Sequence, residues 1–278
     1  MKWHYRSMLV ALLVLTSAFL ARAGETGSGD APRLSVLSYN IHHGEGVDRK
    51  LDLQRIADVI KSVTPDLVAL QEVDKGTQRT NRVDQPATLA RLTGMKVVFG
   101  GNIRYEGGDY GNAVLSRLPI KRHKNHLLPL FGDGEQRGLL EVEVEMANGG
   151  RMLLLLATHL DHRAGNRERL ASAAAINKLV ADRAGQPAVL AGDLNDLPDS
   201  KTLRRFGTVW TRANKKVLPT VPVSQPSKQI DFILFRPATR WKTIEVRVLD
   251  EAVASDHRAI FAVLELLPQQ KTKADRQY

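Results

Sequence analysis

The chain has 278 residues, 43% of them apolar, which is enough for one large α/β domain or two small ones with a substantial core. Its 40 basic and 30 acidic residues give a formal net charge of +10, which favours anionic partners such as nucleic acid, acidic lipid headgroups or phosphorylated small molecules. There is no cysteine, which excludes thiol catalysis, zinc–thiolate sites and disulfides.

The first residues, 1–23, have the pattern of a secretion signal. Lys2 and Arg6 supply the positive start, residues 8–15 form an apolar run, and Ala21-Arg22-Ala23 is a small-x-small cleavage site. The alternative is a membrane anchor, but the apolar run is short for a bilayer span. We therefore expect an exported protein, either periplasmic or extracellular.

Cleavage after Ala23 removes three basic residues and no acid, so 37 basic and 30 acidic residues remain, a net charge of about +7. The mature chain stays basic, although a solvated basic surface would give the same balance. Residues 24–31 are rich in glycine and other small residues and are expected to form a linker.

The first half of the mature chain alternates between strand-like and helix-like patterns. Apolar residues recur with helical spacing after residue 51, and Pro65 ends that helix. The expected elements are a strand at 34–39, a helix at 51–63, a buried strand at 66–71, a helix at 85–92, a short strand at 96–99, a glycine-rich surface loop at 100–111, a strand at 112–116 and a turn at 118–120.

The second half begins with a predicted hairpin. Residues 139–146 alternate apolar with acidic side chains, residues 152–157 are almost wholly apolar, and Asn148-Gly149-Gly150 supplies the turn. The remaining expected elements are a helix at 166–183, a buried strand at 188–191, a short helix at 201–206, an irregular proline-containing segment at 212–228, and strands at 230–235, 243–249 and 259–266.

Six short polar stretches, spread over most of the chain, each lie at or just beyond an apolar run. Since motifs from both ends must combine into one site, we expect one domain over residues 32–268, followed by a polar basic tail at 269–278. Mixed strand pairings with interspersed helices predict an α/β fold of two packed sheets with helices outside. The stretches are Ser38-Tyr39-Asn40-Ile41, Leu70-Gln71-Glu72-Val73, Thr158-His159-Leu160-Asp161, Gly192-Asp193-Leu194-Asn195, Ile230-Asp231-Phe232 and Ser255-Asp256-His257.

The first two stretches contain candidate metal ligands. Glu72 follows a buried strand, where a carboxylate is costly unless a cation compensates its charge. Asn40 ends another strand and offers a neutral oxygen to a hard cation or an amide donor to a phosphate. The alternative for Glu72 is an exposed turn residue or a helix-capping acid, and the alternative for Asn40 is a turn residue. His42 and His43 remain ambiguous: they would line the cleft, but without another nearby histidine pair a transition-metal site is disfavoured.

Two later stretches carry candidate acid–base groups. Asp193 and Asn195 alternate along a segment expected to be extended, so both face one cleft, where a carboxylate can orient or deprotonate water. A calcium loop is the alternative, but the segment lacks the length and the later glutamate of an EF-hand. An amide at the second position can hold a phosphate oxygen as charge develops.

The remaining stretches add two histidines. Neighbouring residues on a strand point in opposite directions, so His257 is expected to pair with Asp231, leaving Asp256 free to assist a metal site. The alternatives are a turn-capping Asp256 and a surface His257. His159 follows an apolar strand and can donate to a phosphate oxygen, or it is a satisfied buried histidine.

Taken in order, these residues resemble the endonuclease/exonuclease/phosphatase superfamily. The resemblance implies a four-layer α/β sandwich, with two packed mixed β-sheets flanked by helices, and a phosphoester hydrolase with no covalent enzyme intermediate. The matching segments are Ser-Tyr-Asn-Ile (38–41), Leu-Gln-Glu-Val (70–73), Tyr-Gly-Asn-Ala-Val-Leu-Ser-Arg (110–117), Thr-His-Leu-Asp (158–161), Gly-Asp-Leu-Asn (192–195), Ile-Asp-Phe-Ile (230–233) and Ser-Asp-His-Arg (255–258).

The resemblance also implies roles for these positions. Mg²⁺, or Mn²⁺, would be bound mainly by Glu72, with help from Asn40 and Asp256. Tyr110 and Asn112 occupy a stretch that approaches the phosphate in relatives.

By the same analogy, Asp193 and the Asp231–His257 pair act on the nucleophilic water, while His159 and Asn195 stabilise phosphoryl oxygens. One departure matters. No acid that would orient the first histidine can be placed here, which makes His159 a phosphate binder rather than a general acid.

The expected function is therefore an exported divalent-metal-dependent phosphodiesterase, and the basic charge favours a nuclease. A phospholipid or small-molecule phosphodiesterase, with transient contact to a lipid surface, is the alternative. A non-catalytic binding protein on the same fold is disfavoured because every expected catalytic position is filled by a competent residue. No obligate protein partner is implied.

Overall fold

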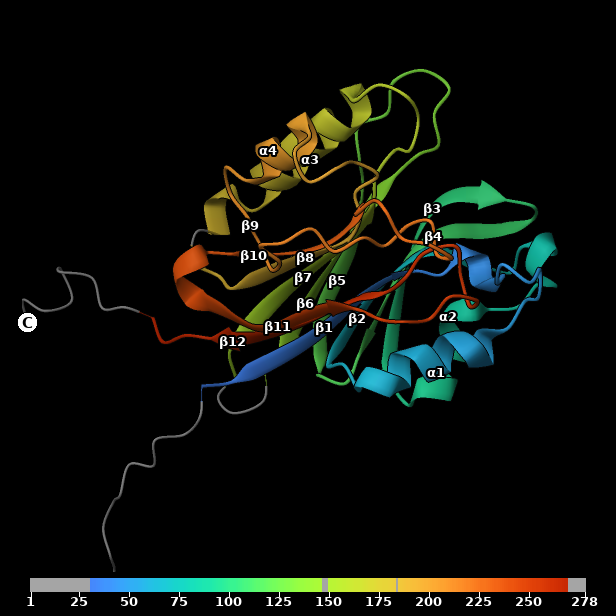
Figure 1. The fold of residues 1–278 in the computed structure, drawn as a ribbon, viewed down its shortest axis with the longest axis horizontal. Coiled ribbons are helices and arrows are strands. Elements are labelled where there is room, and N and C mark those ends of the chain that lie inside the picture. Colours follow the sequence, from blue (N-terminus) through green and yellow to red (C-terminus); the bar gives the residue numbers. More distant parts are fainter. Residues whose placement is uncertain (1–30, 147–149, 184, 270–278) are drawn as a thin grey trace, which may run out of the picture. The chain divides into compact units, whose positions relative to one another are not determined.

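The computed structural model describes residues 31–146, 150–183 and 185–269. The predicted secretion signal at 1–23, all but the last residue of the linker, the turn at 148–149 and residues 270–278 of the tail lie outside this part. Two six-stranded mixed sheets pack together and helices cover their outer faces, which confirms the predicted four-layer α/β sandwich (Figure 1). In the described residues, no helix is both long and apolar enough to cross a bilayer.

The first sheet is built around one parallel pair of strands. β1 (Arg33–Asn40) lies beside β2 (Leu67–Lys75) in parallel, and every other neighbouring pair in this sheet is antiparallel. The remaining strands are β3 (Lys96–Tyr105), β4 (Gly108–Ser116), β11 (Trp241–Val248) and β12 (Ile260–Leu266), and the order across the sheet is β11-β12-β1-β2-β4-β3.

The second sheet repeats this plan. β7 (Met152–His159) runs parallel to β8 (Ala188–Asp193), and the flanking strands are antiparallel to them. The remaining strands are β5 (Ile120–Leu127), β6 (Gly138–Glu145), β9 (Thr211–Arg212) and β10 (Asp231–Arg236), and the order is β5-β6-β7-β8-β10-β9.

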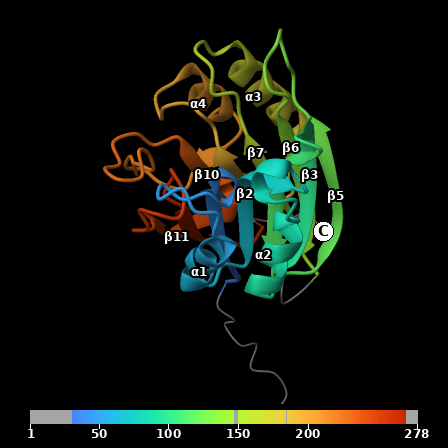
Figure 2. The same ribbon diagram turned by 90° about the vertical axis from the view of Figure 1, so that its right-hand side faces the viewer.

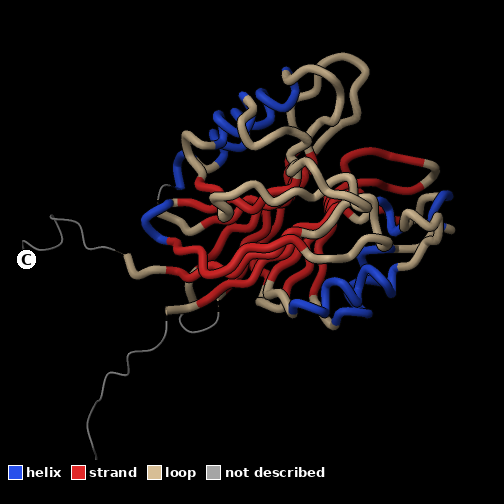
Figure 3. Tube along the Cα trace, in the orientation of Figure 1, coloured by secondary structure: helices blue, strands red, loops and turns tan. Residues whose placement is uncertain are grey.

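Three apolar layers hold the sandwich together. The central layer joins the inner faces of the two sheets, with Val36 and Ala69 from one sheet and Leu155 and Val189 from the other completely buried. A second layer lies beneath α1 (Leu53–Val63) and α2 (Gln85–Thr93), and a third beneath α3 (Arg167–Leu179) and α4 (Lys201–Phe206). Figure 2 shows these two helix pairs on opposite sides of the sheets, and Figure 3 shows the strands enclosed between them.

Alternation of side chains along each strand explains why the core is split in this way. Successive residues point to opposite faces, so Val36 enters the central layer while Leu37 packs beneath the helices. Both faces of the parallel strands are covered, which is why these strands are continuous apolar runs. α1 starts at an Asp52 cap, whose carboxylate accepts a bond from the backbone N–H of Arg55 at 2.9 Å.

The chain topology brings one end of each central strand pair to the same place. β1, β2, β7 and β8 are the parallel strands, and their carboxyl ends carry polar residues. The antiparallel neighbours β10 and β12 start at the same edge, so Asp231 lies opposite Asp193 in the strand register. Six stretches from distant parts of the sequence therefore meet at one edge of the sandwich.

Two expectations for the sequence 100–127 are wrong. Residues 100–111 are not a surface loop, because they extend β3 and β4 into a long hairpin that turns at Glu106 and Gly107. The chain after the turn at 118–120 forms the edge strand β5, which was not predicted because its exposed side chains are mostly basic and polar. The predicted hairpin of β6 and β7 is confirmed.

Candidate active site

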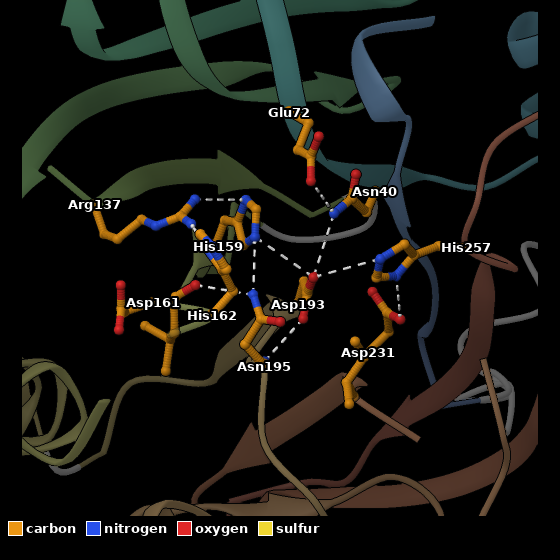
Figure 4. Close-up of polar contacts among 12 residues, drawn as sticks. Asn40, Glu72, Arg137, His159, Asp161, His162, Asp193, Asn195, Asp231 and His257 are labelled. Atoms are coloured by element: carbon orange, nitrogen blue, oxygen red, sulfur yellow. Dashed lines mark hydrogen bonds and ion pairs between the residues drawn. The ribbon is translucent and has the colours of Figure 1, made fainter. Parts of the chain in front are cut away.

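The polar strand ends form one buried cluster, shown in Figure 4. Asn40 comes from the end of β1, Glu72 from β2, Asp193 from the end of β8, and Asp231 from the start of β10. The Asn40, Asp193 and Asp231 side chains are at most 1% exposed. Buried polar groups need partners, and most of those in this cluster find them in one another.

Asn40 joins the two sheets. Its Nδ2 donates to Glu72 Oε1 at 2.9 Å and to Asp193 Oδ2 at 3.3 Å. Its Oδ1 accepts a bond from the backbone N–H of His42 at 3.1 Å, and its carbonyl accepts one from the Ser255 hydroxyl at 2.7 Å. The side chain is therefore fixed at the boundary between the two predicted groups, the metal ligands and the acid–base residues.

Glu72 has the features expected of a cation ligand. It does not follow the strand, as was predicted, but lies half-buried within β2, which continues to Lys75. The pairing of β2 with β4 shifts register there, and the φ of Glu72, +58°, is one that side-chain-bearing residues rarely adopt. In the described part of the chain no lysine or arginine forms an ion pair with it, and its one side-chain bond is the neutral amide of Asn40. A half-buried carboxylate without a compensating charge fits a divalent cation such as Mg²⁺. Asn40 turns its Nδ2, and not its Oδ1, toward Glu72, so its role as a metal ligand stays a prediction.

His257 and Asp231 form the predicted pair. His257 Nδ1 donates to Asp231 Oδ2 at 2.9 Å, which fixes the ring so that Nε2 faces Asp193 Oδ2 at 3.8 Å. Burial works against the imidazolium, but the charge and hydrogen bond of Asp231 outweigh it and raise the pKa of His257 to about 10. This histidine is therefore held as a cation at neutral pH.

Asp193 lies between two histidines. Its Oδ2 is 3.8 Å from His257 Nε2 and 3.5 Å from His159 Nε2. Burial, followed by the nearby Asp231 carboxylate, raises the pKa of Asp193 above its usual range. A carboxyl whose pKa is raised toward neutrality is a more effective base for water than an exposed aspartate.

The predicted extended conformation of Asn195 is wrong. The residue is not part of an extended segment, since its φ of +48° places it in a turn directly after β8. In that turn its backbone N–H donates to Asp193 Oδ1 at 2.8 Å, and its Nδ2 donates to the Leu160 carbonyl at 3.0 Å and lies 3.0 Å from His159 Nε2. Asn195 therefore still lies beside Asp193 and His159, although not by alternation along a strand.

His159 has a partner that was not predicted from the sequence. Arg137 Nη1 lies 3.0 Å from its Nδ1, and the Arg137 Nη2 lies 3.1 Å from His162 Nδ1. Behind the guanidinium, Glu135 Oε1 is 2.7 Å from Nη1. The first histidine is thus oriented by a guanidinium cation that is paired with an acid, and not by an acid in direct contact with the ring.

The guanidinium determines the protonation of His159. A guanidinium can only donate, so Nδ1 must accept and the ring proton must lie on Nε2. Burial, followed by the charge of Arg137, holds the pKa of His159 well below its usual range. His159 is therefore a neutral ring whose protonated Nε2 lies 3.5 Å from Asp193 Oδ2 and is suited to donating to an anionic oxygen.

The pairing of β6 with β7, and not a local pattern in the sequence, identifies Arg137 as a neighbour of His159. Leu139 of β6 lies opposite Thr158 of β7, so two residues before Leu139 the chain passes the His159 end of β7. The hairpin was predicted, but its register was not, and without the register the basic residue has no assigned neighbour.

Tyr110 and Asn112 lie on β4, and each side chain makes a contact that belongs to the fold. Asn112 Nδ2 donates to the Gly138 carbonyl at 3.1 Å, while its buried Oδ1 has no partner in the described residues. The Tyr110 ring packs against the Arg79 guanidinium, 5.2 Å from its centroid. Burial, followed by the charge of Glu72, raises the pKa of Tyr110, so its hydroxyl stays protonated.

Asp256 is set apart from the other candidates. It is exposed, and the hydroxyl of Ser255 donates to its Oδ1 at 3.4 Å. It belongs to neither of the two groups of described histidine and acidic residues that are close enough to share an ion. Its role as a metal ligand stays a prediction. His42 and His43, left ambiguous by the sequence, do lie in one of those groups, together with Glu72.

Comparison with known proteins agrees with this geometry. A model of the Endonuclease/Exonuclease/phosphatase family matches residues 37–257, from the middle of β1 to His257. The chain belongs to this family, and it is accordingly a hydrolase acting on phosphoester bonds. Enzymes of the family generally depend on a divalent metal, which agrees with the acidic and histidine groups described here.

Relatives cover most of the chain. YbhP, an uncharacterized protein of Escherichia coli (strain K12), is 29% identical over 246 residues, covering 83% of this chain and 96% of YbhP. A 5'-tyrosyl-DNA phosphodiesterase of Caenorhabditis elegans is 26% identical over 168 residues, covering 58% of this chain and 42% of that protein. The crystal structure of an endonuclease/exonuclease/phosphatase from Beutenbergia cavernae has a TM-score of 0.71 and 26% identity, covering 84% of this chain and 72% of the other.

Proposed function

We propose that this protein is an exported, Mg²⁺-dependent phosphodiesterase that cleaves nucleic acid by direct attack of water. The observation that carries the reaction type is the position of Asp193, a buried carboxyl between a histidine held as a cation and one held neutral. The mature charge of about +7 and the similarity to a 5'-tyrosyl-DNA phosphodiesterase support nucleic acid as substrate. The pattern of residues 1–23 supports export.

In this proposal Asp193 Oδ2 accepts the proton of the attacking water. His257 Nε2, oriented by Asp231, holds its proton next to that carboxylate and stabilises the ionised form until the water is bound. Because Asp231 is itself anionic and bonded to Nδ1, the ring keeps both its charge and its orientation through the step.

His159 and Asn195 complete the arrangement on the other side of Asp193. In the proposal, His159 through its Nε2–H and Asn195 through its Nδ2 would donate to the non-bridging phosphoryl oxygens as these gain charge. Arg137 orients the ring of the first, and the Leu160 carbonyl holds the amide of the second. A neutral histidine suits this task because its proton is donated as a hydrogen bond and not transferred. Glu72, oriented by the bond from Asn40 Nδ2, would hold Mg²⁺, which would neutralise charge on the phosphoryl group and polarise it when bound.

The test is hydrolysis by the mature protein of plasmid DNA, RNA, bis-p-nitrophenyl phosphate, sphingomyelin and an inositol phosphate, with Mg²⁺ and with EDTA. We expect Mg²⁺-dependent cleavage of a nucleic acid that weakens steeply as salt is raised. Turnover of sphingomyelin alone would transfer the proposal to phospholipids. No metal-dependent turnover of any member, from protein shown to be folded, would overturn it.

Export is tested separately, by expressing the full chain in a bacterial host and sequencing the N-terminus of the protein outside the cytoplasm. A mature chain that begins at Gly24 is the expected result. An intact Met1 on protein recovered from the cytoplasm would contradict it.

A further inference from the structure

A second group of metal-ligand side chains lies next to the proposed Mg²⁺ position. It consists of His42, His43 and Glu72, each half-buried, and one ligand atom from each lies within 4.8 Å of the others. The first two come from the short turn of 3-10 helix after β1, η1 (His42–Gly44), and the third from β2. The proposed function uses only Glu72 of this group.

We propose that His42, His43 and Glu72 form a second cation site, selective for Mn²⁺, Co²⁺ or Zn²⁺ over Mg²⁺. Two imidazoles and one carboxylate are the donor set of borderline transition metals, whereas Mg²⁺ prefers oxygen ligands. Three protein ligands leave coordination positions open to water or a phosphate oxygen. The inference goes beyond the proposed function and shares only Glu72 with it.

The ring of His42 is oriented as a metal ligand requires. Its Nδ1 lies 3.1 Å from the backbone carbonyl oxygen of Glu45. A carbonyl only accepts, so Nδ1 carries the proton and Nε2 has the free lone pair. A backbone carbonyl that holds the second ring nitrogen in this way is the common outer support of a histidine bound to a metal.

His43 supplies a nitrogen that the protein leaves without a partner. Its Nδ1 is buried and forms no hydrogen bond within the described residues. The other nitrogen, Nε2, is 3.9 Å from Glu45 Oε2, which is longer than a hydrogen bond. Buried polar atoms are nearly always satisfied, so an unpartnered nitrogen on a ring that lies in one group with a second histidine and a carboxylate points to an ion at this place.

The backbone of all three residues is held in an unfavourable conformation. The φ angles of His42, His43 and Glu72 are +44°, +43° and +58°, in the left-handed region that residues with a side chain rarely occupy. Such conformations persist only where the surrounding structure enforces them, and they gather at functional sites.

Specific contacts enforce the turn that carries the two histidines. Gln85 Nε2 donates to the His43 carbonyl at 2.6 Å, and the same side chain accepts from the backbone N–H of Asp74 at 3.0 Å. Gly44 follows with a φ of +78°, and a Cβ there would lie 2.8 Å from Leu53 Cδ2. The turn is thereby held by Gln85 at the start of α2 and Leu53 at the start of α1, and the two rings lie in one group with Glu72.

Glu72 can serve both sites because it has two oxygens. Oε1 accepts from Asn40, which leaves Oε2 without a hydrogen bond in the described residues. An ionised carboxylate has about four lone-pair sites on its two oxygens, so one such side chain can contact more than one cation. The alternative is that the two rings, 4.5 Å apart and inclined at 61°, merely fill space in a tight turn.

Co²⁺ is the probe that separates these alternatives, because its visible absorption reports nitrogen ligation without any substrate. Co²⁺ would be titrated into mature wild-type protein in the presence of saturating Mg²⁺, and into His42→Gln, His43→Gln and the control His123→Gln, which replaces an exposed histidine on β5. We expect one equivalent of Co²⁺ in wild type and in the control, and binding at least about tenfold weaker in the other two. Equal Co²⁺ affinity in all four proteins would overturn the proposal.

A second measurement avoids substitution altogether and so does not depend on the variants folding. Zn²⁺ would be added to wild-type protein labelled with ¹⁵N-histidine, and the ring nitrogens followed by NMR. Large shifts confined to one ring nitrogen each of His42 and His43 would support the site. Unshifted resonances of both rings at saturating Zn²⁺ would refute it, whatever the outcome of the hydrolysis assays.

Discussion

The two buried histidines on either side of Asp193 are held by partners of opposite charge. His257 faces the carboxylate of Asp231 at 2.9 Å, and His159 faces the guanidinium of Arg137 at 3.0 Å. The first arrangement raises the pKa of its histidine and the second lowers it. The same side chain, at similar burial and a similar distance from Asp193, thus becomes a cation on one side and a neutral donor on the other.

This difference divides the work of the site. A histidine with a raised pKa stabilises the carboxylate that takes a proton from water, and a histidine with a lowered pKa donates a hydrogen bond without losing its proton. Identical residues therefore have different roles because of what lies behind them. The substitutions below remove or exchange those supporting groups, beginning with the largest expected effect.

Replacing His257 should cost most. His257→Ala removes the cation beside Asp193 and leaves the buried Asp231 carboxylate without its partner, so we expect the hydrolysis rate to fall by about 10²- to 10⁴-fold. Initial rates on the preferred substrate at saturating Mg²⁺ measure the effect, and the exposed His123→Ala serves as the matched control. A rate within about threefold of wild type would exclude an acid–base role for His257.

Replacing Arg137, the partner of His159, should reduce the hydrolysis rate less than replacing His257. Arg137→Met removes the donor to His159 Nδ1, which frees the ring to take the other tautomer and raises its pKa. Loss of a charged hydrogen bond corresponds to about 10- to 100-fold in rate. Arg137→Lys restores a cation beside Glu135 and should recover part of the loss.

A structural role alone for Arg137 would give a different result. In wild type, ¹⁵N NMR should show the His159 proton on Nε2, and in Arg137→Met a mixture of tautomers. In His159→Gln protein, the further change Arg137→Met should have little additional effect on rate, since residues acting through one another are not additive. Fully additive losses would show that Arg137 does not act through His159.

The outcome for His257 and Arg137 shows what sequence could and could not provide. Asp231 and His257 each follow or precede an apolar strand, and polar residues at strand ends are visible without coordinates. Arg137 depends on the register of β6 against β7, which no local pattern specifies. The turn determines which residues of the two strands of a hairpin lie opposite each other, and the sequence predicts the turn to within a few residues.

The same limit applies to the prediction of the strands. Strands that are covered on both faces, such as β7 and β8, are continuous apolar runs and were predicted within a few residues. The outer part of the β3–β4 hairpin and the edge strand β5 were missed, because one face is exposed and their residues resemble a loop. Packing against neighbours, and not local propensity, makes these segments strands.

The Asp231–His257 pair should also make the thermal stability of the protein depend on pH. Because the folded pKa of His257 is raised to about 10 from an unfolded value of about 6.5, its stabilisation is complete below about pH 6.5 and is lost as pH rises through about 10. Thermal unfolding in EDTA should therefore show wild type falling toward His257→Gln between these values, on the order of 5 °C in relative Tm. A constant difference between the two proteins across this range would contradict the raised pKa.

Replacing Asp256 should have the smallest effect on the hydrolysis rate. The substitution tests the difference between the two histidines, because the Asp256 carboxylate acts on the pKa of His257 and not on that of His159. Its carboxylate ranks behind Asp231 and Asp193 among the charges that raise the pKa of His257, and it is exposed to solvent, which screens it. Asp256→Asn should lower the pKa of His257 by less than about one unit and change the rate by less than about threefold. NMR titration of the ring measures the first and initial rates the second, with Asp250→Asn as an exposed acidic control. If Asp256→Asn instead weakens Mg²⁺ activation at least about tenfold, Asp256 is a metal ligand together with Glu72. The protonated His257 would then lie next to the metal and not apart from it.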